Sequence, residues 1–158
     1  SSTKAGEVLM TFKSGERTGF VIFDCICLMV GAASLRASAT AEVAEEMAEA
    51  AKPVISQLDK YIITIAAEGS SKTEVATAVF GIISTIYSGG CLGAVIGAWL
   101  GSLTLGNKIL YAATALTTIV AAVATDGVAE IGLIGLELAT AGWLISDSIK
   151  CAEACEYG

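Results

Sequence analysis

The fold of this chain is decided by two apolar stretches, CLGAVIGAWLGSLTL (residues 91–105) and ILYAATALTTIVAAVAT (residues 109–125). Lys108 is the only charged residue between Val75 and Thr125. The polar turn Gly106-Asn107-Lys108 separates the stretches, so the sequence predicts an apolar helical hairpin over 91–125. Because such a surface would form a large apolar patch in water, we expect this hairpin to be the most buried part of the molecule.

The composition around this hairpin is that of a helical protein. The chain has 158 residues, of which 54% are hydrophobic and 16% charged, against about 25% charged in an ordinary soluble domain. Its one proline, Pro53, leaves little to interrupt helices. We therefore predict a single all-α domain over residues 1–158, a helical bundle in which amphipathic helices surround a central apolar hairpin.

The flanking helices are predicted from caps and periodicity. Ser71 and Glu74 form a capping-box pattern, and Gly69 and the Gly89-Gly90 pair are helix-ending positions. Residues 4–39 imitate a signal peptide; we interpret the apolar run as a buried helix, and an uncleaved signal is the alternative. The predicted elements are a loose polar arm or a short first element over 1–19 and helices over 20–52, 53–68, 71–87, 91–105, 109–125 and 128–156.

Three glycines on the first arm of the hairpin form a strip. Gly93, Gly97 and Gly101 recur every four residues, a spacing typical of closely packed transmembrane helices. Tight packing inside a soluble bundle explains the strip equally, and in either case we expect Gly97 at a close contact between helices. The residues assigned to membrane insertion are these glycines together with Trp99, Lys108 and Tyr111.

The order of the predicted elements resembles that of the α-helical pore-forming toxins, such as the colicin pore domain. The resemblance covers the arrangement over residues 39–156 and involves no shared motif. It implies a secreted bundle of toxin or defence type that places its hairpin in a target lipid membrane and forms a pore or disrupts the bilayer. A homo-oligomer is compatible with it. The alternatives are a soluble binding or assembly module with an apolar surface for a protein or lipid, and a constitutive integral membrane protein.

Several function classes are disfavoured by what the sequence lacks. Without histidine, the chain has neither the commonest general base nor the usual zinc or haem ligand. A net charge of −7 disfavours nucleic acid as a partner. Four glutamates on one predicted helix face are interpreted as a solvated surface, because a metal site needs ligands from several elements. We predict no catalytic site, no metal and no cofactor. The glutamates are Glu42, Glu45, Glu46 and Glu49.

Two carboxylates occur within apolar segments, Asp24 in FVIFDCICLMV and Glu137 in GLIGLELAT. An unpartnered buried carboxylate has a raised pKa, so protonation of these two groups could trigger membrane insertion. The alternative is a satisfied carboxylate that pairs with Lys60, Lys108 or a backbone N–H. If the trigger operates, membrane action should rise steeply as the pH falls.

The chain contains five cysteines. In a secreted protein, Cys25 or Cys27 could form a disulfide with Cys151 or Cys155, and the odd number leaves at least one thiol, such as Cys91, without a partner inside the chain. Buried thiols that act as small hydrophobic side chains are the alternative.

Overall fold

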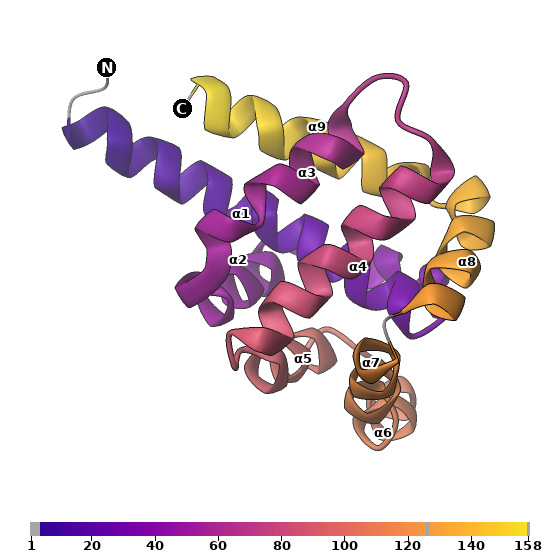
Figure 1. Cartoon of the computed structure of the whole chain (residues 1–158). Helices are drawn as coiled ribbons and strands as arrows, with labels where there is room; N and C mark the ends of the chain where they lie inside the picture. Colours follow the sequence, from indigo (N-terminus) through magenta and orange to yellow (C-terminus); the bar gives the residue numbers. More distant parts are fainter. Residues whose placement is uncertain (1–3, 126, 158) are drawn as a thin grey trace.

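A computed structural model describes the backbone of residues 4–125 and 127–157 and the side chains of residues 15–125, 127 and 129–154. Throughout that part of the chain the regular structure is helical, which confirms the all-α prediction (Figure 1). The elements are α1 (Lys4–Met29), η1 (Ala33–Ser38), α2 (Ala41–Ala50), η2 (Lys52–Gln57), α3 (Asp59–Ala66), α4 (Lys72–Ser88), α5 (Leu92–Leu100), α6 (Leu105–Ala112), α7 (Ala115–Ala124), α8 (Val128–Glu137), η3 (Leu138–Thr140) and α9 (Gly142–Tyr157).

The second half of α1 is the centre of the core. Every residue from Val21 to Met29 is buried, so this helix is enclosed on all its faces. It packs against α2 and α9 and, less extensively, against α4, α5 and α8. Figure 1 shows α1 running through the middle of the molecule, while α5, α6 and α7 lie along its lower edge.

Close packing around α1 and α4 depends on two glycines outside the predicted strip. A methyl group at Gly19 would overlap the backbone carbonyl of Ala44, so α1 and α2 can approach this closely only with glycine there. A methyl group at Gly81 would overlap the ring of Tyr61, which sets the contact between α3 and α4.

Local signals placed several helix ends correctly. The Ser71 hydroxyl accepts a hydrogen bond from the Glu74 N–H, and the Glu74 carboxylate accepts one from the Ser71 N–H, each at 3.1 Å. Gly69 and Gly90 have φ angles of +88° and +76° where α3 and α4 finish, a conformation that favours glycine. The predicted capping box and both glycine ends are therefore confirmed.

The predicted helix over 20–52 is wrong in two respects. First, it is interrupted at Gly31, where φ is +69°, and is divided into α1, η1 and α2. Second, the helix starts earlier than predicted: α1 begins at Lys4, so the predicted loose arm over 1–19 is helical in its described part, residues 4–19.

The late part of the chain also departs from the prediction. The turn between the hairpin arms lies at residues 101–104, and Gly106-Asn107-Lys108 belongs to α6. The single helix predicted over 128–156 is divided, and its two parts, 129–140 and 142–154, meet at 91°.

The placement of the hairpin at the centre of the core is wrong. Most residues from 109 to 125 are exposed, and only Ala115, Ile119 and Ala122 among them are buried. The hydrophobic core instead forms around α1, whose side chains are larger and more densely apolar on every face. An alanine- and threonine-rich helix offers less apolar area to bury than isoleucine and phenylalanine do.

Candidate functional site

An exposed apolar helix is the most unusual surface feature of the protein. α6 and α7 together form one helical segment, Leu105–Ala124, with a mean hydropathy of 1.4, and most of its residues are exposed. Large hydrophobic side chains face solvent along it, with exposed fractions of 73% at Leu105, 68% at Ile109 and 58% at Leu110. We call this segment the outer helix.

The outer helix is attached to the bundle by its inner face. Ile119 is fully buried there, and the Tyr111 ring packs edge-on against Trp99 at 5.6 Å between centroids. Trp99 in turn lies 6.4 Å from Phe23 of α1 and is itself fully buried. An aromatic contact therefore anchors the outer helix to the core, and Trp99 is a core residue in this structure.

The length of the outer helix matches the thickness of a membrane. Twenty residues at a rise of about 1.5 Å each extend about 30 Å, which equals the hydrocarbon core of a bilayer. By length and composition this is one helix able to cross a membrane, and the described chain has up to three such segments if each of two bent helix pairs is counted. Those pairs are α4 with α5, bent by 112°, and residues 129–140 with 142–154.

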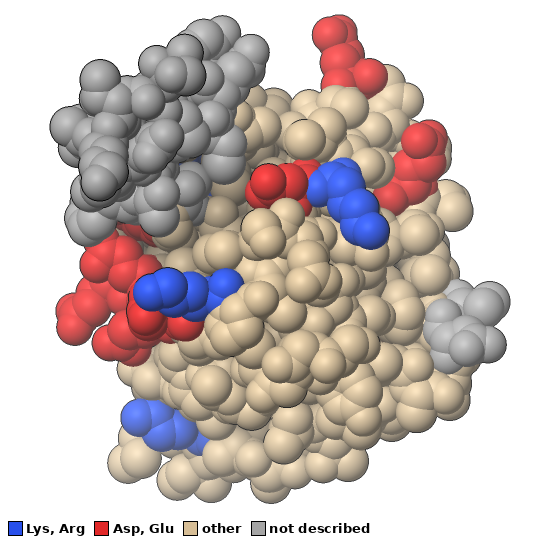
Figure 2. Space-filling model, turned by 60° about the vertical axis from the view of Figure 1, so that its left-hand side comes forward, with Lys and Arg blue, Asp and Glu red and all other residues tan. Residues whose placement is uncertain are grey.

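Charge is almost absent from the outer helix. Lys108 is its single charged residue, exposed in the first turns of α6. Its long stem allows the ammonium group to reach a polar interface while the helix backbone lies deeper. On the face shown in Figure 2, charged side chains gather toward the upper and left parts, and a broad surface below them is almost entirely uncharged.

The predicted glycine strip does not form a close helix contact. Gly93 and Gly97 are exposed, and a methyl group at either would meet no atom within 4 Å. Gly101 has near it only carbonyl oxygens of the preceding turn, those of Ala98 and Gly97. The expectation that Gly97 lies at a close contact between helices is therefore wrong for this structure.

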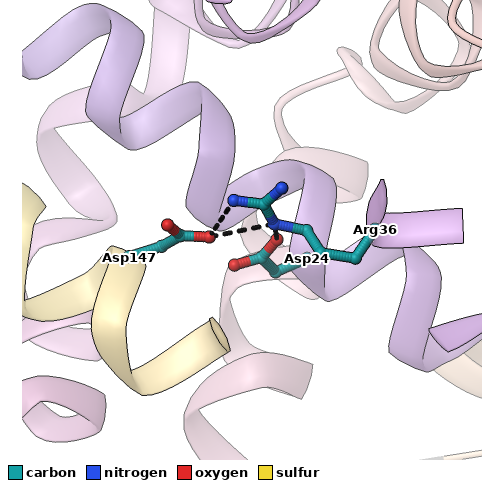
Figure 3. A network of polar contacts seen from close by, with 3 residues as sticks. All are labelled: Asp24, Arg36 and Asp147. Carbon is teal, nitrogen blue, oxygen red and sulfur yellow. Dashed lines mark hydrogen bonds and ion pairs between the residues drawn. The ribbon is translucent and has the colours of Figure 1, made fainter. Parts of the chain in front are cut away.

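A largely buried cluster of three ionisable side chains joins distant parts of the chain (Figure 3). The Arg36 guanidinium, from η1, approaches Asp24 of α1 at 2.7 Å and Asp147 of α9 at 2.9 Å. Its Nε and Nη2 atoms both donate hydrogen bonds to Asp147 Oδ2. Arg36 also lies over the Phe20 ring at 5.1 Å. Asp24 thus lies within ion-pair distance of Arg36, although neither of its buried carboxylate oxygens has a partner in good hydrogen-bond geometry. Neither lysine considered from the sequence takes the role of Arg36.

The cluster has two carboxyl groups for one guanidinium. Burial raises the pKa of Asp24 to about 11; Asp147 adds to the rise and Arg36 opposes it. Asp24 therefore holds a proton at neutral pH, and the ion pair is formed by Arg36 and Asp147. Because the folded-state pKa lies above the ordinary 3.8, the stabilisation from Asp24 is complete below 3.8 and is lost as the pH rises toward 11. Mild acid gives Asp24 no further proton.

Glu137 remains the predicted protonation trigger. It ends α8, is partly buried, and has one carboxylate oxygen, Oε2, that is buried without a hydrogen-bond partner. Burial raises its pKa, and the nearby Glu130 raises it further. The pKa is thus shifted in the direction that the sequence predicted for an apolar setting.

Comparison of the chain with known protein families, curated proteins and solved structures finds no match.

The cysteines do not form the predicted disulfide. Cys25, Cys27 and Cys91 are buried thiols, and no disulfide links them to one another or to Cys151. The Cys151 sulfur instead shares a hydrogen bond with the Thr18 hydroxyl at 3.3 Å. The side chain of Cys155 lies outside the described residues. Burial raises the pKa of the Cys27 thiol to about 12, so this sulfur is protonated and unreactive.

Among the described residues, no three histidine, cysteine, aspartate or glutamate side chains gather as a metal would require. The four α2 glutamates named above are exposed. Sequence reasoning missed Arg36 and Asp147, whose segments gave no indication that they would meet. The one usable indication was Asp24, because a buried carboxylate must find a cation or keep its proton.

Proposed function

We propose that this protein acts at lipid membranes and binds them through the outer helix. The observation that carries the proposal is the exposure of a 20-residue, nearly uncharged helix on the surface of an otherwise well-packed bundle. Moving each large side chain of this helix from water into hydrocarbon is favourable by up to about 1.5–3 kcal/mol. Several such side chains on one helix favour a membrane over water.

The more specific proposal is a secreted protein of toxin or defence type that disrupts a target membrane. It is supported by the combination of a closed core around α1 and an apolar helix that is already available at the surface. Such a protein could bind a bilayer without first exposing its core. The helix that makes contact would then be the second arm of the hairpin predicted from the sequence, with the first arm remaining against the bundle through Trp99.

A soluble assembly module is the second candidate. Gly93 and Gly97 are uncovered, and the neighbouring outer helix exposes Ile109 and Leu110, so a partner protein or a second copy could pack there. A constitutive integral membrane protein is the third, supported by the two bent helix pairs that are apolar enough to cross. The three candidates differ in whether the chain needs detergent, and in whether it binds lipid or protein.

Vesicle flotation tests the proposal. The purified protein, prepared without detergent, would be mixed with phosphatidylcholine vesicles, which carry no net charge, and centrifuged through a density gradient. The variant Ile109→Ser with Leu110→Ser should reduce the floating fraction at least about tenfold, because both side chains lose their transfer free energy. The matched control is Ile63→Ser with Tyr87→Ser, which alters two exposed hydrophobic residues on α3 and α4 instead of the outer helix.

The control variant should float like wild type. Failure of wild-type protein to float, together with a concentration-dependent dimer in size-exclusion chromatography, would replace the membrane proposal with the assembly module. Protein that precipitates without detergent would favour the integral membrane candidate.

A further inference from the structure

The connections of the outer helix restrict how it can meet a bilayer. Residues 101–104 join its first end to α5, and residues 125–127 join its second end to α8. A helix that crossed the membrane alone would place everything before Leu105 on one side and everything after Ala124 on the other. That arrangement requires α8 and α9 to leave the rest of the bundle.

In the closed structure, α8 and α9 are firmly part of that bundle. α9 packs along α1 and α3, and α8 packs along α4. Polar contacts of the described residues reinforce α9, among them the pair between Arg36 and Asp147 and the hydrogen bond between Thr18 and Cys151. With this packing intact, the outer helix can only lie along the membrane surface, as interfacial helices do.

The segment after the outer helix is itself apolar enough to enter a bilayer. Taken as one helix, residues 129–140 and 142–154 contain a stretch apolar enough to cross a membrane, and a bend of 91° next to Ala141 keeps them folded onto the bundle. Residues 129–146 contain two charged side chains, Glu130 and Glu137, whereas Asp147, Lys150 and Glu153 follow them, so 129–146 is the part that can enter a bilayer. If this bend opened, the segment could return the chain across the membrane. Both ends of the inserted region would then lie on the same side, and the topological conflict would disappear.

We infer that the protein has two membrane states, a surface-bound closed bundle and an opened state in which residues 105–124 and 129–146 insert as a transmembrane helical hairpin, with the contact of Arg36 to Asp147 as the latch between them. This inference rests on the proposed membrane function. The hairpin differs from the one predicted over 91–125, because its first arm is the outer helix and its second arm is α8 with the first turn of α9.

The arrangement of the charged cluster suits a latch. Among the described residues, the pair between Arg36 and Asp147 is the one ion pair that connects α8 or α9 to the rest of the molecule. When α9 departs, Asp147 leaves with it, but Arg36 stays 2.7 Å from Asp24. Because Asp147 is one of the groups that raise the pKa of Asp24, its departure favours loss of the Asp24 proton, and the resulting carboxylate can replace Asp147 as the partner of Arg36.

A disulfide lock tests the two states. The Thr18 oxygen lies 3.3 Å from the Cys151 sulfur, so Thr18→Cys places a second sulfur within reach of a disulfide that ties α9 to α1. Wild-type protein in oxidising and reducing buffer controls for effects of the buffer, and circular dichroism checks that the variant stays helical. Flotation on phosphatidylcholine vesicles reports surface binding, and release of a trapped dye reports insertion.

The oxidised variant should float like wild type, yet release dye at least about tenfold more slowly, and dithiothreitol should restore release. Asp147→Asn, which weakens the latch without a lock, should release dye faster than wild type. Equal release from the oxidised and reduced variant would overturn the inference, as would flotation without release from any form. If no form floats, the membrane proposal itself fails, and that outcome is distinct from the other two.

Discussion

Two apolar helices of this protein occupy opposite environments. The second half of α1 is enclosed on every face although it contains a carboxyl group, Asp24, whereas the outer helix lies at the edge of the molecule although it contains none. Burial therefore does not follow the local absence of charge. It follows side-chain size and the availability of partners for the one polar group that is enclosed.

The physical reason lies in what each helix can contribute to a core. From Val21 to Met29, α1 presents branched and aromatic side chains on all faces, whereas α7 is largely alanine and threonine. Burying the larger side chains removes more apolar area from water. The cost of enclosing Asp24 is limited because it keeps its proton and lies beside Arg36.

A measurement of stability tests the difference between α1 and the outer helix most directly. Phe23→Ala should lower the free energy of unfolding by about 3–5 kcal/mol, because it opens a cavity beside Trp99. Ile109→Ala on the outer helix should change it by about 0.5 kcal/mol or less, because the side chain is already in water. Urea denaturation followed by circular dichroism measures both. Similar losses for the two variants would mean that the outer helix belongs to the core.

Local features of this fold could be predicted from the sequence, and long-range ones could not. The capping box at Ser71, the glycine ends at Gly69 and Gly90 and the helical class follow from chemistry within a few residues, and all are present. The choice of central helix was wrong because it relied on the absence of charge, which favours residues 109–125, whereas residues 20–35 have the larger apolar side chains and one carboxyl group whose partner Arg36 could not be foreseen. Their ranking depends on which elements cover them.

The candidate site also has some features that could be predicted from the sequence and others that could not. The apolar character and near neutrality of the outer helix are properties of the sequence and were predicted, although its exposure was not. The cluster of Asp24, Arg36 and Asp147 brings together residues up to 123 positions apart in sequence numbering. No spacing rule predicts such a meeting, since it depends on how α1, η1 and α9 pack.

Two glycine variants, one in the core and one at the surface, should change the free energy of unfolding by smaller amounts and in opposite directions. Gly19→Ala should destabilise the protein by about 1–3 kcal/mol, because the added methyl group overlaps the Ala44 carbonyl and α2 must move. Gly97→Ala should stabilise it by up to about 1 kcal/mol, because alanine is the better helix former and nothing lies near the new methyl group. Thermal and urea unfolding measure both. Destabilisation by Gly97→Ala would show that α5 is covered in solution, by a partner or a second copy.

The smallest expected effect concerns pH and separates the two membrane states. The outer helix carries no carboxylate, so flotation on uncharged vesicles should depend little on pH. Insertion of residues 129–146 carries Glu137 into hydrocarbon and Glu130 to the end of the inserted segment, and for Glu137 the protonated acid is far less costly there than the ion. The pKa of Glu137 is already raised in the closed bundle, by burial and then by Glu130. In that state its stabilising contribution is complete at low pH and is lost as the pH rises through the raised pKa, so acid alone does not open the bundle. Acid favours insertion only because hydrocarbon raises the pKa of Glu137 further than the closed structure does.

Dye release should therefore increase as the pH falls. The variant Glu137→Gln, which imitates the protonated acid, should move the midpoint of release upward by on the order of half a pH unit. Glu46→Gln on the exposed face of α2 is the matched control and should leave the midpoint unchanged. Release curves that coincide for Glu137→Gln and wild type would exclude Glu137 as the trigger, and a shift of the flotation curve by the same amount would place its effect on binding instead of insertion.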